Sequence, residues 1–244
     1  MTTDLLERTT TESRTTWRSL LRWAAIAGIT EYVIVMALVE KAVIPPIVII
    51  GVLLIVGVTR LRGRDKAGVR LTTIAFGLFL LTNLVFASPS LLVPASLASF
   101  AVTWAAVVTG VVGLAAGVAT WRARGSTIAP TRVGLAGVGV AVVAVVISLV
   151  ASLGFTDAKP QAGDIVVKAT DSTFAPVTLT APHGQVTFFL DNTDNALHNF
   201  HITGGGTKSM PANHKVRFSA TLAPGTYEFL CDLHNDMKGT LTVS

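Results

Sequence analysis

The first two thirds of the chain consist of long apolar runs separated by short polar loops. Each run is near the roughly 20 residues that cross a bilayer as a helix. The fourth run is long enough to be tilted or to contain a re-entrant piece, but two spans there would break the charge pattern of the loops. The pattern therefore predicts five transmembrane helices, at 22–39, 42–58, 71–87, 92–119 and 133–155.

The last third of the chain has a different pattern, in which short alternating runs are separated by turn residues such as Gly204-Gly205-Gly206 and Pro224-Gly225. This pattern is typical of a β-sandwich. We expect strands at 165–169, 177–180, 185–190, 199–203, 215–222, 226–230 and 239–243. The predicted domains are a disordered Thr-rich cytoplasmic tail at 1–16, an all-α transmembrane bundle at 17–156, a linker at 157–163 and an all-β domain at 164–244.

The first apolar run does not have the features of a cleavable signal peptide. It begins about 20 residues into the chain, contains Glu31, and is followed by further charges and another apolar run without a small-residue cleavage site. We therefore expect it to remain in the mature protein.

Composition supports a membrane protein. Hydrophobic residues make up 51% of the 244 positions and charged residues only 14%, which is too apolar for an ordinary soluble protein. Residues 1–156 carry 13 Lys and Arg against 6 Asp and Glu, whereas residues 157–244 carry 6 against 8. Because the positive residues lie in short loops and form no basic stripe, we expect no nucleic-acid partner.

The loop charges also predict the orientation in the membrane. The loop between the first two runs holds only Glu40 and Lys41, and the loop at 88–90 holds no charge. The other loops and the tail hold the positive residues, namely Arg8, Arg14, Arg18, Arg22, Arg60, Arg62, Arg64, Lys66, Arg70, Arg122, Arg124 and Arg132. Since positive loops favour the cytoplasm, we expect a multi-pass cell-membrane protein with a cytoplasmic N-terminus and an extracytoplasmic C-terminal domain.

Two polar side chains fall inside predicted spans. Glu31 lies near the middle of the first and Asn83 lies in the third. A buried acid is costly in a membrane, so Glu31 is either a functional residue or a neutral helix-packing contact. All five histidines follow residue 182, so the spans offer no histidine ligand for a b-type haem.

The candidate chemistry lies near the C-terminus. Cys231, the only cysteine, is followed by His234 and Met237, and His198 precedes it by 33 residues. One thiolate, two imidazoles and one thioether are the ligand types of a mononuclear blue-copper site, which points to electron transfer. Zinc also accepts Cys and His but gains little from a thioether, so it is the lesser alternative.

This Cys-x2-His-x2-Met run, together with His198-Asn199, resembles the cupredoxins, and its spacing is most like amicyanin. The resemblance covers the last third of the chain and implies a Greek-key sandwich with one type 1 copper. It implies His198, Cys231 and His234 as strong ligands, Met237 as the weak axial ligand, and Asn199 as the residue that ties the two ligand segments together. The chain departs from the usual pattern at Leu197 and at Asn235-Asp236, which makes the surface beside His234 more polar.

The remaining His and Met residues near this pattern have ordinary interpretations. Strand alternation puts His201 on the opposite face from His198, so we expect a surface histidine there. His183 and His214 lie in polar contexts and are expected to be exposed, and Met210 is expected to pack in a loop.

The sequence therefore predicts a membrane-anchored type 1 copper protein that transfers single electrons to or from a redox partner protein, for which a respiratory oxidase or reductase is an analogy. We expect no enzyme activity and no small-molecule substrate, since the predicted ligands leave no open position. One alternative is copper capture or delivery, although Met36 is the only methionine within a span. A third interpretation makes the helices a scaffold for a larger complex.

Overall fold

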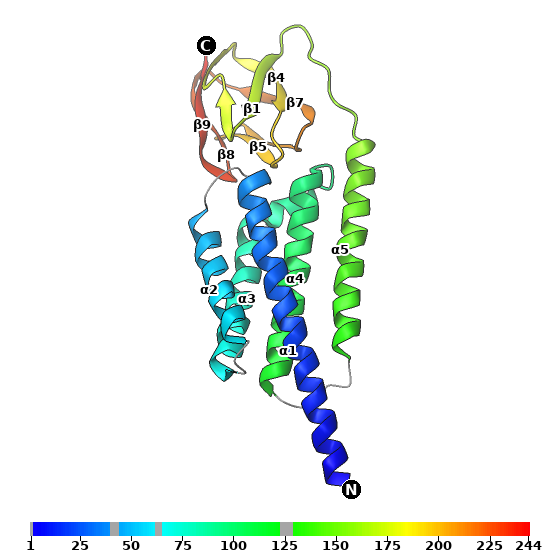
Figure 1. The fold of residues 1–244 in the computed structure, drawn as a ribbon. Helices are drawn as coiled ribbons and strands as arrows, with labels where there is room; N and C mark the ends of the chain where they lie inside the picture. Colours follow the sequence, from blue (N-terminus) through cyan, green and yellow to red (C-terminus); the bar gives the residue numbers. More distant parts are fainter. Residues whose placement is uncertain (1, 40–43, 62–64, 123–128) are drawn as a thin grey trace. The chain divides into compact units, whose positions relative to one another are not determined.

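The computed structural model describes residues 2–39, 44–61, 65–122 and 129–244 (Figure 1). The chain forms two compact units. Unit 1 comprises Met1–Ala37, Ala42–Leu91 and Ala101–Val146. Unit 2 comprises Leu38–Lys41, Leu92–Phe100 and Ile147–Ser244.

The described residues contain five α-helices, which confirms the predicted number. They are α1 (Thr2–Ile34), α2 (Pro45–Leu61), α3 (Lys66–Phe86), α4 (Leu97–Arg122) and α5 (Pro130–Leu153). A π-helical turn at Val35–Val39 continues α1, and a 3-10 turn at Ser88–Leu92 precedes α4. Four segments are long and apolar enough to cross a membrane, namely Thr16–Val39 and helices α3, α4 and α5. Helix α2 has 17 residues, at the lower end of the range for a span.

All five helices differ from the expected boundaries, and α1 differs most. Helix α1 extends back to Thr2, whereas the sequence predicted a disordered tail over residues 1–16. Once the apolar span has formed a helix, each added residue gains one hydrogen bond without a new nucleation cost, so the helix continues into the polar segment. The fourth apolar run, expected from residue 92, contains a single α-helix that begins at Leu97.

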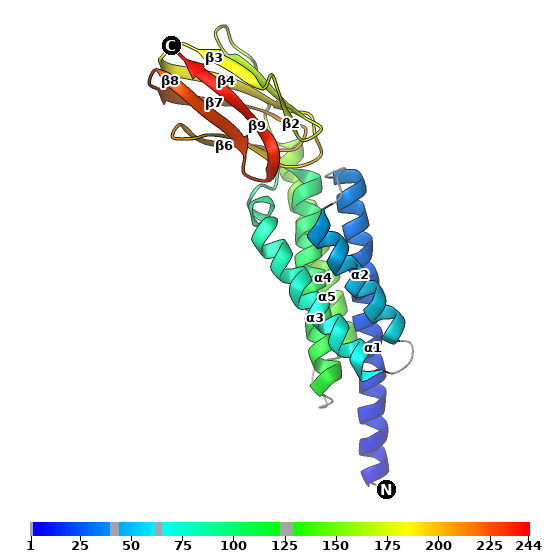
Figure 2. The same cartoon turned by 90° about the vertical axis from the view of Figure 1, so that its left-hand side faces the viewer.

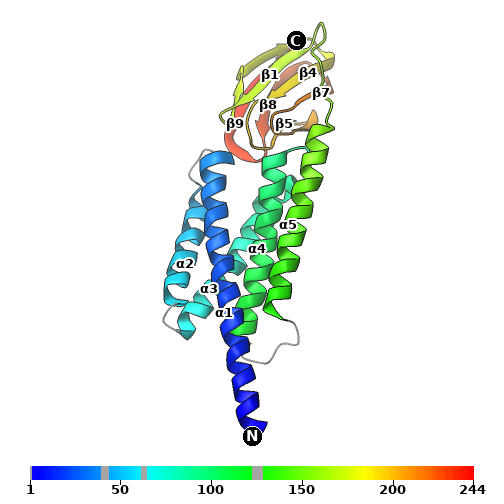
Figure 3. The ribbon, with the colours of Figure 1, turned by 45° about the vertical axis from the view of Figure 1, so that its right-hand side comes forward.

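Unit 1 packs through small residues and aromatic rings. Helices α1, α2 and α3 contact one another, and α5 lies beside α4, where Gly137 faces Val108 and Val112 (Figure 3). A Cβ at Gly113 would overlap the ring of Phe76, so only glycine permits this close approach of α4 to α3. On α5 the apolar side chains of Leu135 and Val138 are exposed, as expected where lipid covers a helix.

The two polar residues of the spans make hydrogen bonds within unit 1. The Thr109 hydroxyl donates to Glu31 Oε1 at 2.7 Å and joins α4 to α1. Asn83 Nδ2 donates to the carbonyl of Phe79 in its own helix at 2.8 Å. The helix-packing alternative for Glu31 therefore has a specific contact.

Unit 2 contains a β-sandwich of nine strands (Figure 2). One sheet has the order β2-β1-β4-β7 and the other the order β3-β9-β8-β5-β6. The strands are β1 (Ile165–Thr170), β2 (Thr173–Ala175), β3 (Thr178–Ala181), β4 (Gly184–Asn192), β5 (His198–Ile202), β6 (Gly206–Met210), β7 (Lys215–Leu222), β8 (Gly225–Cys231) and β9 (His234–Val243).

The alternation that predicted the strands reflects burial between the two sheets. In β5 the side chains of His198, Phe200 and Ile202 are buried and the two between them are half-exposed. Seven of the nine strands coincide with predicted runs. The sequence missed β2, which has only three residues, and β6, in which four exposed residues precede the buried Met210.

Candidate metal centre

The Cys-x2-His spacing corresponds to a tight hairpin. Strands β8 and β9 are antiparallel, and their register places Cys231 opposite His234. An irregularity in the ladder between Leu230 and Cys231 marks the start of this turn. Two residues between the cysteine and the histidine are therefore enough to bring both side chains to the same end of the sheet.

His198 reaches the same point from a third strand. Strand β5 pairs with β8 through His201 opposite Leu230 and Ile202 opposite Phe229, so the start of β5 lies beside the end of β8. The Nδ1 atoms of His198 and His234 are 3.0 Å apart. Cys231 Sγ lies 3.9 Å from His198 Nδ1 and 3.5 Å from His234 Nδ1.

These three residues form a group suited to a metal ion. Their donor atoms all lie within 4.8 Å of one another. His198 is fully buried, Cys231 is 2% exposed, and His234 is partly exposed. Met237 follows on β9, is 1% exposed, and belongs to the same apolar cluster as Cys231. Of the three residues, only His234 is partly accessible to solvent.

Asn199 connects the two segments that carry this group. Its backbone N–H donates to Cys231 Sγ at 3.4 Å. Its Nδ2 donates to Asp232 Oδ2 at 2.6 Å, and the Asp232 N–H donates back to Asn199 Oδ1 at 2.8 Å. Three hydrogen bonds therefore fix β5 against the Cys231–His234 turn.

The surroundings of Cys231 favour its thiolate. Burial raises the pKa of the thiol, but hydrogen bonds from His198, His234 and the backbone N–H groups of Asn199 and Leu233 lower it by more, to about 6. The thiolate is the form that binds a metal, so the ligand is already available at neutral pH.

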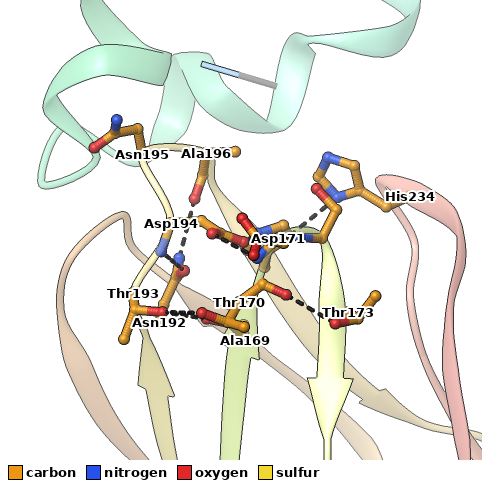
Figure 4. A network of polar contacts seen from close by, with 12 residues as sticks. Ala169, Thr170, Asp171, Thr173, Asn192, Thr193, Asp194, Asn195, Ala196 and His234 are labelled. Carbon is orange, nitrogen blue, oxygen red and sulfur yellow. Dashed lines mark hydrogen bonds and ion pairs between the residues drawn. The ribbon is translucent and has the colours of Figure 1, made fainter. Parts of the chain in front are cut away.

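The sequence did not predict the roles of three residues around the group, an aspartate and two serines. Asp194 Oδ2 lies 2.9 Å from His198 Nε2. Figure 4 shows Asp194 within a network of polar contacts. Ser99 Oγ accepts the Leu197 N–H at 3.0 Å, and Ser96 Oγ accepts the Ala212 N–H at 2.7 Å. Both serines are far away in sequence, so spacing alone could not have indicated them.

The other three histidines lie outside the metal group. His201 is half-exposed and pairs with Asp232 at 2.9 Å, and His183 is exposed. The expectation for His214 was wrong, because its side chain is only 12% exposed, packs against the Phe155 ring and pairs with Asp157 at 3.0 Å. Met210 lies in β6 and not in a loop, and it is fully buried.

Comparison with known proteins agrees with this geometry. Residues 140–243 match the family model of the cupredoxin-like domain. The C-terminal part of the chain is a cupredoxin-like domain. The resemblance to the cupredoxins, inferred from the Cys-x2-His-x2-Met run, is therefore confirmed.

Solved structures similar to this chain include several amicyanins. A reduced amicyanin variant is 24% identical, with a TM-score of 0.32 over 37% of this chain and 90% of its own. A Cu(I) form of another variant is 25% identical, with the same TM-score and coverage. Amicyanin from Paracoccus versutus is 19% identical, with a TM-score of 0.31 over 35% of this chain and 86% of its own. Comparison with curated protein sequences gives no match.

The cupredoxin-like family implies copper as the cofactor, and the residues present fit it. A thiolate and two imidazoles within 4.8 Å of one another, with a buried thioether on the same hairpin, are the donor types that this metal takes in cupredoxins.

Proposed function

We propose that this protein is a membrane-anchored type 1 copper protein that transfers single electrons on the outer face of the cytoplasmic membrane. The observation that carries the proposal is the convergence of His198, Cys231 and His234 donor atoms within 4.8 Å. When bound, copper supplies a one-electron Cu(II)/Cu(I) couple.

In this proposal His198, Cys231 and His234 would hold the metal, and the Met237 thioether would be a weaker ligand that tunes the potential. Asn199 lowers the electron density on the sulfur through its N–H and keeps the two ligand segments in register. Since three strands and their hydrogen bonds fix these side chains, the site changes little between redox states. These protein ligands leave no open position for a substrate, so we assign an electron carrier and not a catalyst.

The route for the electron is the partly exposed edge of His234. Asp232 and Asp236 lie beside it and are exposed, while Cys231 and Met237 are buried. An acidic surface around the exposed ligand favours a redox partner with a positive patch, because complementary charge speeds the encounter. The side chain of Asn235, which the sequence places at the same edge, lies outside the described residues.

The function test uses the full-length, copper-loaded protein and native membranes that contain its partner. Asp236→Asn should slow electron exchange about two- to fivefold at low salt and weaken its salt dependence, because one steering charge is lost. The copper spectrum should not change. The rates are measured by stopped-flow absorbance.

The matched control is Glu228→Gln, which removes one exposed negative charge from β8 and should leave the rate unchanged. If Asp236→Asn has no effect and the reduced protein instead gives Cu(I) readily to a chelator, copper capture or delivery is the function and electron transfer is not.

The positive residues at the helix ends support the proposed orientation in the membrane. Arg60 lies in the last turn of α2, Lys66 begins α3 and Arg122 ends α4. In Figures 1 and 3 these ends lie at the same end of unit 1 as the N-terminal part of α1. Of the loop charges used for the prediction, Glu40, Lys41, Arg62, Arg64 and Arg124 lie outside the described residues.

A reporter that is active only outside the cytoplasm should therefore work when fused after Ser244 and fail when inserted beside Arg64, because the positive loops stay in the cytoplasm. Enzyme activity of both fusions is compared at equal expression. An active reporter beside Arg64 together with an inactive reporter after Ser244 would contradict the proposed orientation.

A further inference from the structure

The two nitrogen atoms of the His198 ring face different partners. Nδ1 points to the metal group, 3.0 Å from His234 Nδ1 and 3.9 Å from Cys231 Sγ. Nε2 points away from it, 2.9 Å from Asp194 Oδ2. The imidazole is fully buried and the Asp194 side chain is 10% exposed. Solvent therefore has little access to either side of the ring.

Backbone groups hold the Asp194 carboxylate in place from the other side. The Asp171 N–H donates to Oδ1 at 2.8 Å and the Ser172 N–H donates to Oδ2 at 3.0 Å. Asp171 and Ser172 form the two-residue turn between β1 and β2, with φ values of 48° and 54°. Asp171 is of a type that tolerates this left-handed conformation, but serine rarely adopts it, and such a conformation persists where surrounding contacts require it.

The backbone of Asp194 is fixed as well (Figure 4). Its N–H donates to Asn192 Oδ1 at 3.0 Å, and its carbonyl accepts the Asn213 N–H at 3.1 Å. Asn192 is 1% exposed, and its Nδ2 lies within 3.1 Å of three backbone carbonyls, those of Ala196, Met210 and Pro211. Hydrogen bonds therefore hold both the main chain and the side chain of Asp194 in place.

An ionised carboxylate can only accept hydrogen bonds, so the imidazole nitrogen that faces Asp194 must carry the proton. In the neutral ring, the other nitrogen then has a free lone pair. For His198 this places the proton on Nε2 and the lone pair on Nδ1. The opposite tautomer would leave a buried carboxylate facing a buried lone pair.

We propose that Asp194 is a positioning residue that fixes His198 as its Nε2–H tautomer and so presents Nδ1 to the copper. This rests on the proposed function, because it assigns the metal to the Nδ1 side of the ring. A carboxylate behind a ligating imidazole also makes the imidazole a stronger donor, which stabilises Cu(II) more than Cu(I). Asp194 therefore holds the reduction potential down.

The first test uses the full-length, metal-free protein labelled with 15N in its five histidines. Long-range 1H–15N correlation distinguishes the tautomers, and we expect His198 to carry a slowly exchanging proton on Nε2. A proton on Nδ1 alone would overturn the proposal. This measurement needs no substitution and no copper, so it still decides the question if the wild type binds no copper and the proposed function fails.

The second test is Asp194→Asn, which keeps the shape of the side chain but removes its charge. Cu(II) affinity should fall about 10- to 100-fold, the usual range for residues that orient metal ligands. The potential should rise, by about 59 mV for each tenfold loss of Cu(II) affinity relative to Cu(I). The slowly exchanging Nε2–H signal should be lost or exchange faster.

The matched control is Asp157→Asn, which alters a second His–Asp contact of the unit, between the largely covered His214 Nδ1 and Oδ1 of the exposed Asp157 at 3.0 Å. It should leave copper affinity and potential at wild-type values. If Asp194→Asn binds Cu(II) within twofold of the wild type at an unchanged potential, or if Asp157→Asn shifts both equally, Asp194 does not act through His198.

Discussion

Replacing Cys231 by serine in the full-length protein is expected to abolish the visible colour of the copper-loaded form. The colour of such a centre comes from charge transfer between the thiolate sulfur and Cu(II), and a hydroxyl cannot provide it. Affinity for copper should fall by more than about 100-fold, the upper end of the cost for residues that merely surround a ligand. Absorbance and competitive titration with a chelator of known affinity measure both effects.

Met237→Leu is the matched comparison, since it also removes a sulfur atom from the β8–β9 hairpin. It should retain copper and colour but shift the reduction potential, because in the proposed site the thioether would be a weak ligand that tunes the couple. A Cys231→Ser protein that remains coloured, or a wild-type protein that binds copper without colour, would contradict the assignment of the site.

Phe200→Ala is expected to destabilise the β-sandwich by about 3–5 kcal/mol, the usual cost of removing a fully buried phenylalanine. Phe200 lies on β5, two residues after His198, and has no exposed surface. Its ring centroid lies 5.1–6.4 Å from those of four other rings, of Phe174, Phe188, Phe218 and Phe229. Near-ultraviolet circular dichroism during thermal unfolding should show an earlier transition.

Two comparisons serve as controls for the Phe200→Ala measurement. Phe218→Ala removes a partly exposed ring from the edge of the same cluster and should cost less than Phe200→Ala. Excess copper should restore part of the lost stability, since a ligand that binds only the folded state favours it. Equal losses for the two variants would mean that Phe200 is not at the centre of the core.

Local patterns were sufficient for most of the architecture. Apolar runs longer than any strand predicted the helices, and alternation predicted β5 and β8, because burial on one face of a strand repeats every second residue. The Cys231–His234 spacing could be recognised because a two-residue turn fixes the geometry of a hairpin. These features depend on neighbouring residues only.

The rest depended on contacts between distant parts of the chain. Strand β6 has no apolar alternation and exists because it pairs with β5. Asp194 contacts His198 within the same segment, but its carboxylate is fixed by the turn at Asp171-Ser172. His214 was expected to be exposed because its neighbours in sequence are polar, whereas Phe155 and Asp157 cover it. No local pattern reports such pairings.

The serine contacts have a consequence for how the copper domain can be isolated. Ser96 and Ser99 accept the backbone N–H groups of Ala212 and Leu197, the residue directly before His198. A fragment that begins in the segment predicted to be a linker, 157–163, lacks both serines, and water must take their place. The His198 segment of that fragment would be looser, so under the proposed function the reorganisation energy of its electron transfer would exceed that of the full-length protein.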